Sequence, residues 1–115
     1  MTGELDETAR APYERLVADL ETGNARFRTL VQVGDVLVRL GVMQGEFHWH
    51  KHDEQDEFFF VLDGRFCIEL EGAEAVELGP RQAFAVPAGM LHRPVVAVRS
   101  TVLMIEKAGV VATGD

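Results

Sequence analysis

A succession of short apolar runs with a period of two, beginning near Phe27, is the feature that most limits the fold of this chain. Turn residues interrupt these runs about every 8 to 12 positions, the spacing of strands in all-β sandwiches and barrels. The first long run alternates Val36, Val38, Leu40 and Val42 with Leu37, Arg39, Gly41 and Met43. Alternate side chains of a strand project from opposite faces, so this run predicts one strand with two distinct faces. We predict an all-β sandwich or barrel of about eight or nine short strands.

One predicted strand is apolar on both faces. Residues 58–62 read Phe-Phe-Phe-Val-Leu, which is typical of a strand covered on both sides, at the centre of a sandwich or at a subunit interface. Since an N-terminal arm is also available to cross onto a neighbour, we expect a homodimer packed through a sheet face. The Asp63-Gly64 pair that follows predicts a two-residue hairpin turn.

The chain is long enough for one domain and too short for two. We predict an N-terminal arm at residues 1–30, a barrel at residues 31–108 and a tail at residues 109–115. In the arm, helix-like spacing is shown by Tyr13, Leu16, Val17 and Leu20. This spacing predicts a short amphipathic helix over residues 9–20, and a loosely packed arm is the alternative.

Composition limits the classes of function. Of the 115 residues, 47% are hydrophobic and 26% charged, as in ordinary globular proteins. No apolar run is long enough to span a membrane, and the acidic N-terminus differs from a secretory signal, so we expect a cytoplasmic protein. The net charge of −8, without a cluster of Lys and Arg, disfavours nucleic acid and anionic membranes as partners. The single cysteine, Cys67, cannot form an internal disulfide and is predicted to be a small buried residue.

Three of the four histidines lie at alternate positions: His48, His50 and His52. We predict a strand over residues 46–52, preceded by a turn at Gln44-Gly45. All three imidazoles would then project from one face of that strand.

Two further residues complete a set of metal ligands. Glu57 begins the next predicted strand after a polar connection, so its carboxylate can return beside the histidines in a hairpin-like pair. His92 follows a turn at Pro87-Ala-Gly89 that could place it at a barrel mouth. The predicted ligands are His50, His52, Glu57 and His92. Three imidazoles and a carboxylate suit divalent Mn, Fe, Co, Ni, Cu or Zn better than Mg or Ca, with Fe, Mn, Ni and Zn as the main candidates.

At these positions the sequence resembles the cupins. Their first motif, G-x5-H-x-H-x3-4-E-x6-G, is matched by His50, His52, Glu57 and Gly64, while Gly45 lies one residue closer to His50 than the first glycine of the motif. Their second motif, G-x5-P-x-G-x2-H-x3-N, is matched by Pro87, Gly89 and His92, while Arg81 replaces its first glycine and Val96 its asparagine. The histidine stretch and the tail look like those of small single-domain bacterial cupins, which are often labelled mannose-6-phosphate isomerase-like.

The resemblance covers roughly residues 33–106. It implies a double-stranded β-helix of the jelly-roll type, with a metal inside the barrel held by the four predicted ligands. His48 is predicted to orient the ligands or line the pocket rather than bind the metal. Trp49 is predicted to lie in the core or at an interface. Arg39 and Arg65 could reach an anionic substrate, but single charged side chains usually lie on the surface, and this is the predicted position of both.

Three hypotheses of function remain open. The first is a metal-dependent enzyme that acts on a small organic acid or sugar-like substrate, by dioxygenase or by isomerase or lyase chemistry, with His48 or Glu46 as the available general base. The second is a binding module that holds such a molecule without turning it over. The third is a regulatory domain. This hypothesis is disfavoured because residues 1–30 are too few and too acidic to form a DNA-binding helix-turn-helix.

Overall fold

The computed structural model describes residues 13–22 and 26–109. The predicted arm before residue 13 and the tail after residue 109 lie outside the described residues. The described residues form one helix and seven strands, in the order α1 (Tyr13–Thr22), β1 (Phe27–Val33), β2 (Val36–Glu46), β3 (Glu57–Asp63), β4 (Phe66–Leu70), β5 (Val76–Leu78), β6 (Ala83–Val86) and β7 (His92–Lys107). Within the described part of the chain, α1 has 10 residues and no helix is long and apolar enough to cross a membrane.

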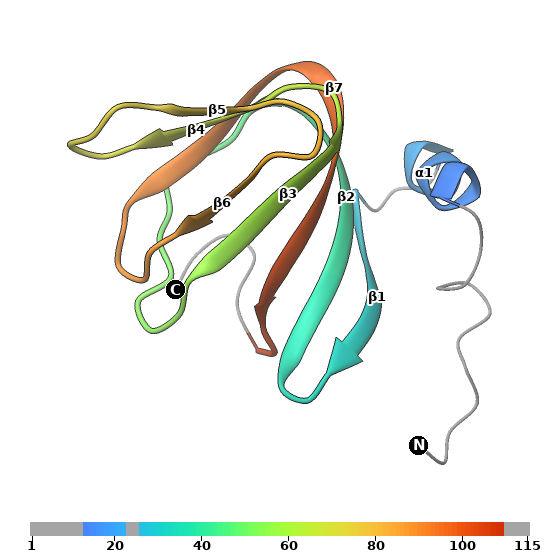
Figure 1. The fold of residues 1–115 in the computed structure, drawn as a ribbon, viewed down its shortest axis with the longest axis horizontal. Helices are drawn as coiled ribbons and strands as arrows, with labels where there is room; N and C mark the ends of the chain where they lie inside the picture. Colours follow the sequence, from blue (N-terminus) through green and yellow to red (C-terminus); the bar gives the residue numbers. More distant parts are fainter. Residues whose placement is uncertain (1–12, 23–25, 110–115) are drawn as a thin grey trace.

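The sheet is built around β7, which has 16 residues and pairs on both of its edges (Figure 1). β2 runs antiparallel to it along one edge. Along the other edge, β3 pairs with the second half of β7 and β4 with the first half. The stretch from His92 to Lys107 is therefore one continuous strand that joins both parts of the sheet.

Gly64 turns a corner between β3 and β4, and the predicted hairpin at Asp63-Gly64 is wrong. The two strands do not pair with each other, because both pair with β7. Gly64 has a φ of 97°, which glycine adopts without strain, and a Cβ at this position would collide with Ser100. The Ser100 hydroxyl accepts a hydrogen bond from the Arg65 N–H at 3.0 Å, which fixes the corner against β7.

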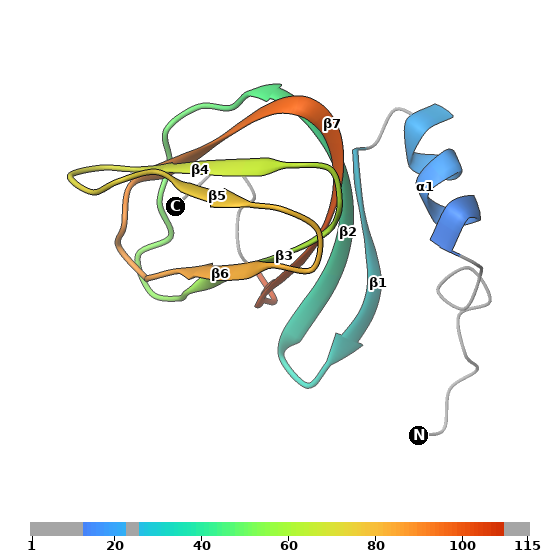
Figure 2. The same ribbon diagram turned by 45° about the horizontal axis from the view of Figure 1, so that its top comes forward.

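The sheet curls until its ends approach and forms a barrel, seen almost end-on in Figure 2. The main path of the sheet is β1-β2-β7-β3-β6, and β5 joins it through β4. This arrangement confirms the predicted all-β, jelly-roll fold. The interior is filled by Met43, Phe59, Val61, Phe66, Ile68, Leu78, Val86, Val96, Val102 and Met104.

β2 has the two faces that its alternation predicts, and they serve different purposes. Arg39 and Met43 belong to the face inside the barrel. Leu40 and Val42 belong to the outer face, where they pack against α1. The predicted amphipathic helix is confirmed from Tyr13 onward, since α1 buries Leu16 and Leu20 in this contact.

Candidate metal centre

The predicted strand over residues 46–52 is wrong, because the histidine segment is irregular. β2 continues through the predicted turn at Gln44-Gly45 and ends at Glu46. A shift in register between Met43 and Gly45 marks a β-bulge, which bends a strand without ending it. Residues 47–52 therefore form no regular strand, and His50 makes an isolated bridge within them.

Backbone contacts with β7 hold this segment in place. The Phe47 N–H donates to the Pro94 carbonyl at 3.0 Å, and His50 and His92 exchange two hydrogen bonds of 2.9 Å. The segment thus pairs with the start of β7, and the predicted hairpin-like pair with the strand of Glu57 is not formed.

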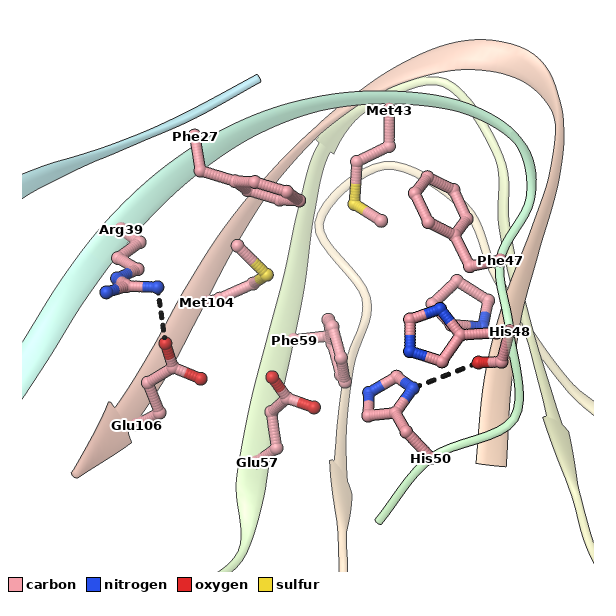
Figure 3. Close-up of a pocket in the computed structure, with 11 residues that line it drawn as sticks. Phe27, Arg39, Met43, Phe47, His48, His50, Glu57, Phe59, Met104 and Glu106 are labelled. Atoms are coloured by element: carbon pink, nitrogen blue, oxygen red, sulfur yellow. Dashed lines mark hydrogen bonds and ion pairs between the residues drawn. The ribbon is translucent and has the colours of Figure 1, made fainter. Parts of the chain in front are cut away.

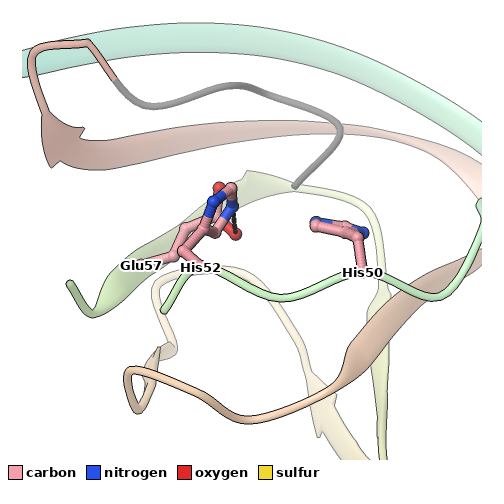
Figure 4. Close-up of side chains that lie close together, drawn as sticks. All are labelled: His50, His52 and Glu57. Atoms are coloured by element: carbon pink, nitrogen blue, oxygen red, sulfur yellow. Dashed lines mark ion pairs between the residues drawn. The ribbon is translucent and has the colours of Figure 1, made fainter. Parts of the chain in front are cut away.

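Three of the predicted ligands form a cluster that could hold a metal ion (Figure 4). One ligand atom from each of His50, His52 and Glu57 lies within 4.8 Å of the others. His52 and Glu57 are buried, and His50 is half-buried, so the cluster lies at the boundary between the core and the cavity. Glu57 is placed by β3, of which it is the first residue.

His92, the fourth predicted ligand, lies beside this cluster. It is the first residue of β7 and is 1% exposed. Its Nε2 is 3.2 Å from Glu57 Oε1, and His52 Nε2 is 3.5 Å from the same oxygen. The centres of the His50 and His92 rings are 4.4 Å apart. All four residues thus come together from three separate parts of the chain.

The turn before β7 supports two of these histidines. The Gly89 N–H donates to the His52 carbonyl at 2.8 Å, and Gly89 has a φ of 79°, which explains the glycine of the second motif. The Met90 carbonyl lies 2.9 Å from His92 Nδ1. One short turn therefore fixes the backbone of His52 and the ring of His92.

Hydrogen bonds to carbonyl groups fix the tautomers of two histidines. Nδ1 of His50 lies 3.0 Å from the His48 carbonyl, and Nδ1 of His92 contacts the Met90 carbonyl in the same way. Since a carbonyl only accepts, Nδ1 carries the proton in both rings, and each neutral ring then offers the lone pair of Nε2. Imidazoles that bind a metal directly are commonly oriented in this way. His48 thus orients His50 through its backbone rather than its ring.

The donor set fits a divalent transition metal. His92 Nε2 and Glu57 Oε1 are both acceptors when the ring is neutral, so their separation of 3.2 Å favours a cation between them. Burial lowers the pKa of His50, which keeps that ring neutral as a ligand must be. Burial raises the pKa of Glu57, but its polar contacts with His92, Glu106 and His52 outweigh this effect, so the pKa is lowered overall.

Glu106, which sequence reasoning missed, extends the site along β7. It is 4% exposed, and its carboxyl group interacts with Glu57 and lies 3.0 Å from Arg39 Nη1. Burial and the neighbouring Glu57 carboxylate raise the pKa of Glu106 to about 7, although the Arg39 charge opposes the shift. The signal was present in the sequence, because Glu106 is in phase with Val102 and Met104 on the inner face of the strand.

Arg39 is inside the barrel, so its predicted surface position is wrong. Its side chain is 24% exposed and borders a cavity of about 220 Å³ beside the histidine cluster (Figure 3). The lining is mostly apolar and consists of Phe27, Arg39, Met43, Phe47, His48, His50, Glu57, Phe59, Pro94, Met104 and Glu106. His48 therefore lines the pocket, as predicted, whereas Trp49 is 42% exposed and lies on the outer surface below Arg93.

Comparisons with known proteins place the chain among a group with this fold. Residues 36–106 match the family model described as the cupin domain. The Bacillus subtilis (strain 168) protein YdbB, described as uncharacterized, is 36% identical over 78 residues, which are 68% of this chain and 69% of YdbB.

Solved structures give the same result. A cupin-2 domain containing protein from Shewanella frigidimarina superposes with a TM-score of 0.77 at 24% identity, covering 88% of this chain and 97% of that one. KdgF from Halomonas sp. superposes with a TM-score of 0.61 at 26% identity, over 69% of this chain and 75% of KdgF. The DMSP lyase DddQ from Ruegeria pomeroyi shares the fold at 22% identity and a TM-score of 0.61, over 72% of this chain and 46% of DddQ.

Proposed function

The chain belongs to the cupin family, and on this premise we propose that it is a metal-dependent protein acting on a small organic molecule. His50, His52, Glu57 and His92 would hold a divalent transition metal such as Fe, Mn, Ni or Zn. The observation that carries the proposal is the pair of oriented imidazoles, since His50 and His92 both direct a free Nε2 lone pair away from their backbone partners.

A metal held in this way would supply Lewis-acid chemistry or, if redox-active, chemistry with O2, which are the isomerase or lyase and the dioxygenase types of reaction. The protein's own groups would position the substrate and move protons. His48 lines the cavity and is available as a general base. Glu46 is not a candidate for this role, because it is 71% exposed and lies near Arg93 on the outer surface.

The shape of the cavity supports a small substrate. Its volume of about 220 Å³ lies below the roughly 300 Å³ at which sites for drug-sized ligands begin. Mostly apolar walls would exclude water and strengthen electrostatic interactions at the polar side. The cavity would admit a ligand of the size of a small organic acid or a sugar-like molecule. The protein would act on this ligand in the cytoplasm.

Elemental analysis of protein purified without a metal-binding tag tests the proposal. The wild type should contain, or take up, about one transition-metal ion per chain, and the His50→Ala/His92→Ala variant should contain none. His48→Ala is the matched control, since it removes a histidine of the same segment that is not a proposed ligand, and it should keep the metal. Folded wild type that takes up no metal on reconstitution would contradict the proposal. Metal binding without turnover of any small acid or sugar would instead favour the binding module.

A further inference from the structure

The cavity has a polar side and an apolar side. Figure 3 shows Arg39, Glu106, Glu57 and His50 in a row, with Phe27, Met43 and Phe47 across the cavity from them. The row is continuous, because Arg39 contacts Glu106, Glu106 contacts Glu57, and Glu57 belongs to the histidine cluster. A ligand in this space would therefore meet charged groups on one side and hydrocarbon on the other.

The net charge at this polar side of the cavity depends on whether a metal is bound. With the histidines neutral, the described residues that line the cavity contribute one cation, Arg39, and two carboxylates, Glu57 and Glu106, for a net charge of −1. A divalent metal changes the net charge to +1. A proton held on Glu106 would raise it to +2 and leave its sign unchanged. Because a net charge in an apolar cavity is costly, the loaded site favours a ligand that carries a compensating negative charge.

Arg39 retains donors for such a ligand. Only its Nη1 is engaged by a described residue, Glu106, at 3.0 Å. Its Nε is buried and makes no hydrogen bond to any described residue. A guanidinium has five N–H donors, and a buried donor without an acceptor is costly, so an acceptor from a bound molecule would be stabilising here.

Resting on the metal site proposed above, we propose that the cavity selects small monocarboxylates with an apolar body. The carboxylate would lie along the polar row, within reach of the Arg39 guanidinium and the metal cluster. The body would pack against Phe27, Met43 and Phe47. A sugar would be a poorer ligand, since the apolar side offers no partners for its hydroxyl groups.

Calorimetric titration with hexanoate and hexanamide tests this inference, because the two probes share their apolar body and differ in charge. Metal-loaded wild type should bind hexanoate about tenfold or more tightly than hexanamide, the effect of one charge-assisted hydrogen bond. Protein stripped with a chelator should lose this preference.

Two substitutions should move the preference in opposite directions. In the loaded protein, Arg39→Gln removes the guanidinium and should abolish the preference for hexanoate, whereas Glu106→Gln removes a competing carboxylate and should increase it. Glu106→Gln also provides a separate test if Arg39→Gln does not fold. Arg65→Gln is the matched control, because Arg65 is 65% exposed outside the cavity and pairs with Glu77, and it should change nothing.

The outcomes separate this inference from the metal site on which it rests. Protein that takes up no metal would overturn both. Loaded protein that binds the two probes equally, or binds neither, would overturn the monocarboxylate inference alone. A preference that persists unchanged in both the Arg39 and the Glu106 variants would also overturn it, since direct coordination to the metal would then account for the binding.

Discussion

The Arg93 guanidinium lies 5.2 Å from the centre of the Trp49 ring and so joins β7 to the irregular histidine segment on the outer surface of the barrel. The same side chain donates from Nε to Glu69 Oε1 at 2.6 Å and lies 3.7 Å from Glu46 Oε1. Arg93 thus connects the end of β2, the histidine segment and β4. Its neighbour His92 points into the barrel, so this outer cluster fixes the backbone that carries two proposed ligands.

Arg93→Ala should therefore weaken metal binding by about tenfold, as loss of a group that orients the ligands does in other metal sites. The reason is that Trp49 loses its contact with the Arg93 side chain, which loosens the segment next to His50, while the four ligands remain present. Titration with Co2+, followed by visible absorption, would measure both the affinity and the geometry of the ligands. Arg65→Ala removes an exposed arginine and its 3.6 Å ion pair, and it should leave both quantities unchanged. A normal Co2+ spectrum and affinity in Arg93→Ala would refute the positioning role.

The stability of the metal-free protein should fall as the pH rises from about 4.5 to about 7. The pKa of Glu106 is about 7 in the folded protein, compared with an ordinary value of 4.5, so between these values the folded state binds more protons than the unfolded state. The free energy of unfolding then decreases with increasing pH, by at most about 3 kcal/mol for a shift of this size. The lowered pKa of Glu57 acts below 4.5 and so lies outside this window.

Urea unfolding of chelator-treated protein at pH 5 and pH 8 would measure this effect. Glu106→Gln should remove most of the difference between the two pH values. Glu77→Gln, which changes an exposed carboxylate on β5, should leave it intact. Equal stability of the wild type at both pH values would show that burial of Glu106 is compensated elsewhere.

The four proposed ligands could be predicted from the sequence because few residue types bind transition metals and their spacing is restrictive. The backbone that presents them could not. A period of two at His48, His50 and His52 is compatible with a strand, but β2 ends earlier, and the segment makes only an isolated bridge with β7 at His50 and one backbone hydrogen bond from Phe47. Pairing partners distant in sequence decide this outcome, and local alternation carries no information about them.

The inner face of β2 was also not predictable from apolar content. Val36, Val38, Leu40 and Val42 form the more uniformly apolar face, and yet it faces outward toward α1 and solvent. The opposite face contains Arg39 and Gly41, and it lines the cavity because a binding site needs polar groups and space. A Cβ at Gly41 would lie 2.6 Å from the Phe27 ring, so glycine permits Phe27 to line the cavity. The usual pattern, in which the more apolar face of a strand points into the core, is therefore reversed in β2 at this site.

We predict a homodimer that forms through the outer face of this sheet. Cross-strand register aligns an apolar row of Val31, Val38, Ile105, Phe58 and Ala85 on that face. α1 covers only the adjacent region around Leu40, and Val31 remains 49% exposed. A contiguous apolar row of this kind is typical of an interface.

Light scattering at micromolar concentration would test the dimer, which Val31→Glu should dissociate without loss of metal. Val98→Glu is the matched control, because Val98 is similarly exposed, at 50%, but lies outside the row. A monomeric wild type would contradict the prediction, as would a Val31→Glu variant that stays dimeric.

Arg81→Gly should stabilise the protein. Arg81 occupies the position of the first glycine of the second cupin motif and has a φ of 65°, in the left-handed region that non-glycine residues rarely adopt. Its N–H donates to the Val61 carbonyl at 2.7 Å, so the turn holds it in this conformation. The left-handed conformation costs about 1 to 2 kcal/mol for a residue with a Cβ, and glycine adds about 0.4 to 1 kcal/mol of entropy to the unfolded chain.

The expected net gain is roughly 0.5 to 1 kcal/mol in the free energy of unfolding, measured by urea denaturation. Arg81→Ala is the control that separates backbone strain from loss of the arginine side chain, since alanine keeps the Cβ and should give little or no gain. Because Arg81 is exposed, neither substitution should disturb the core. Equal stability of the glycine and alanine variants would show that the turn imposes no strain at this position, and that the glycine of the motif serves another purpose.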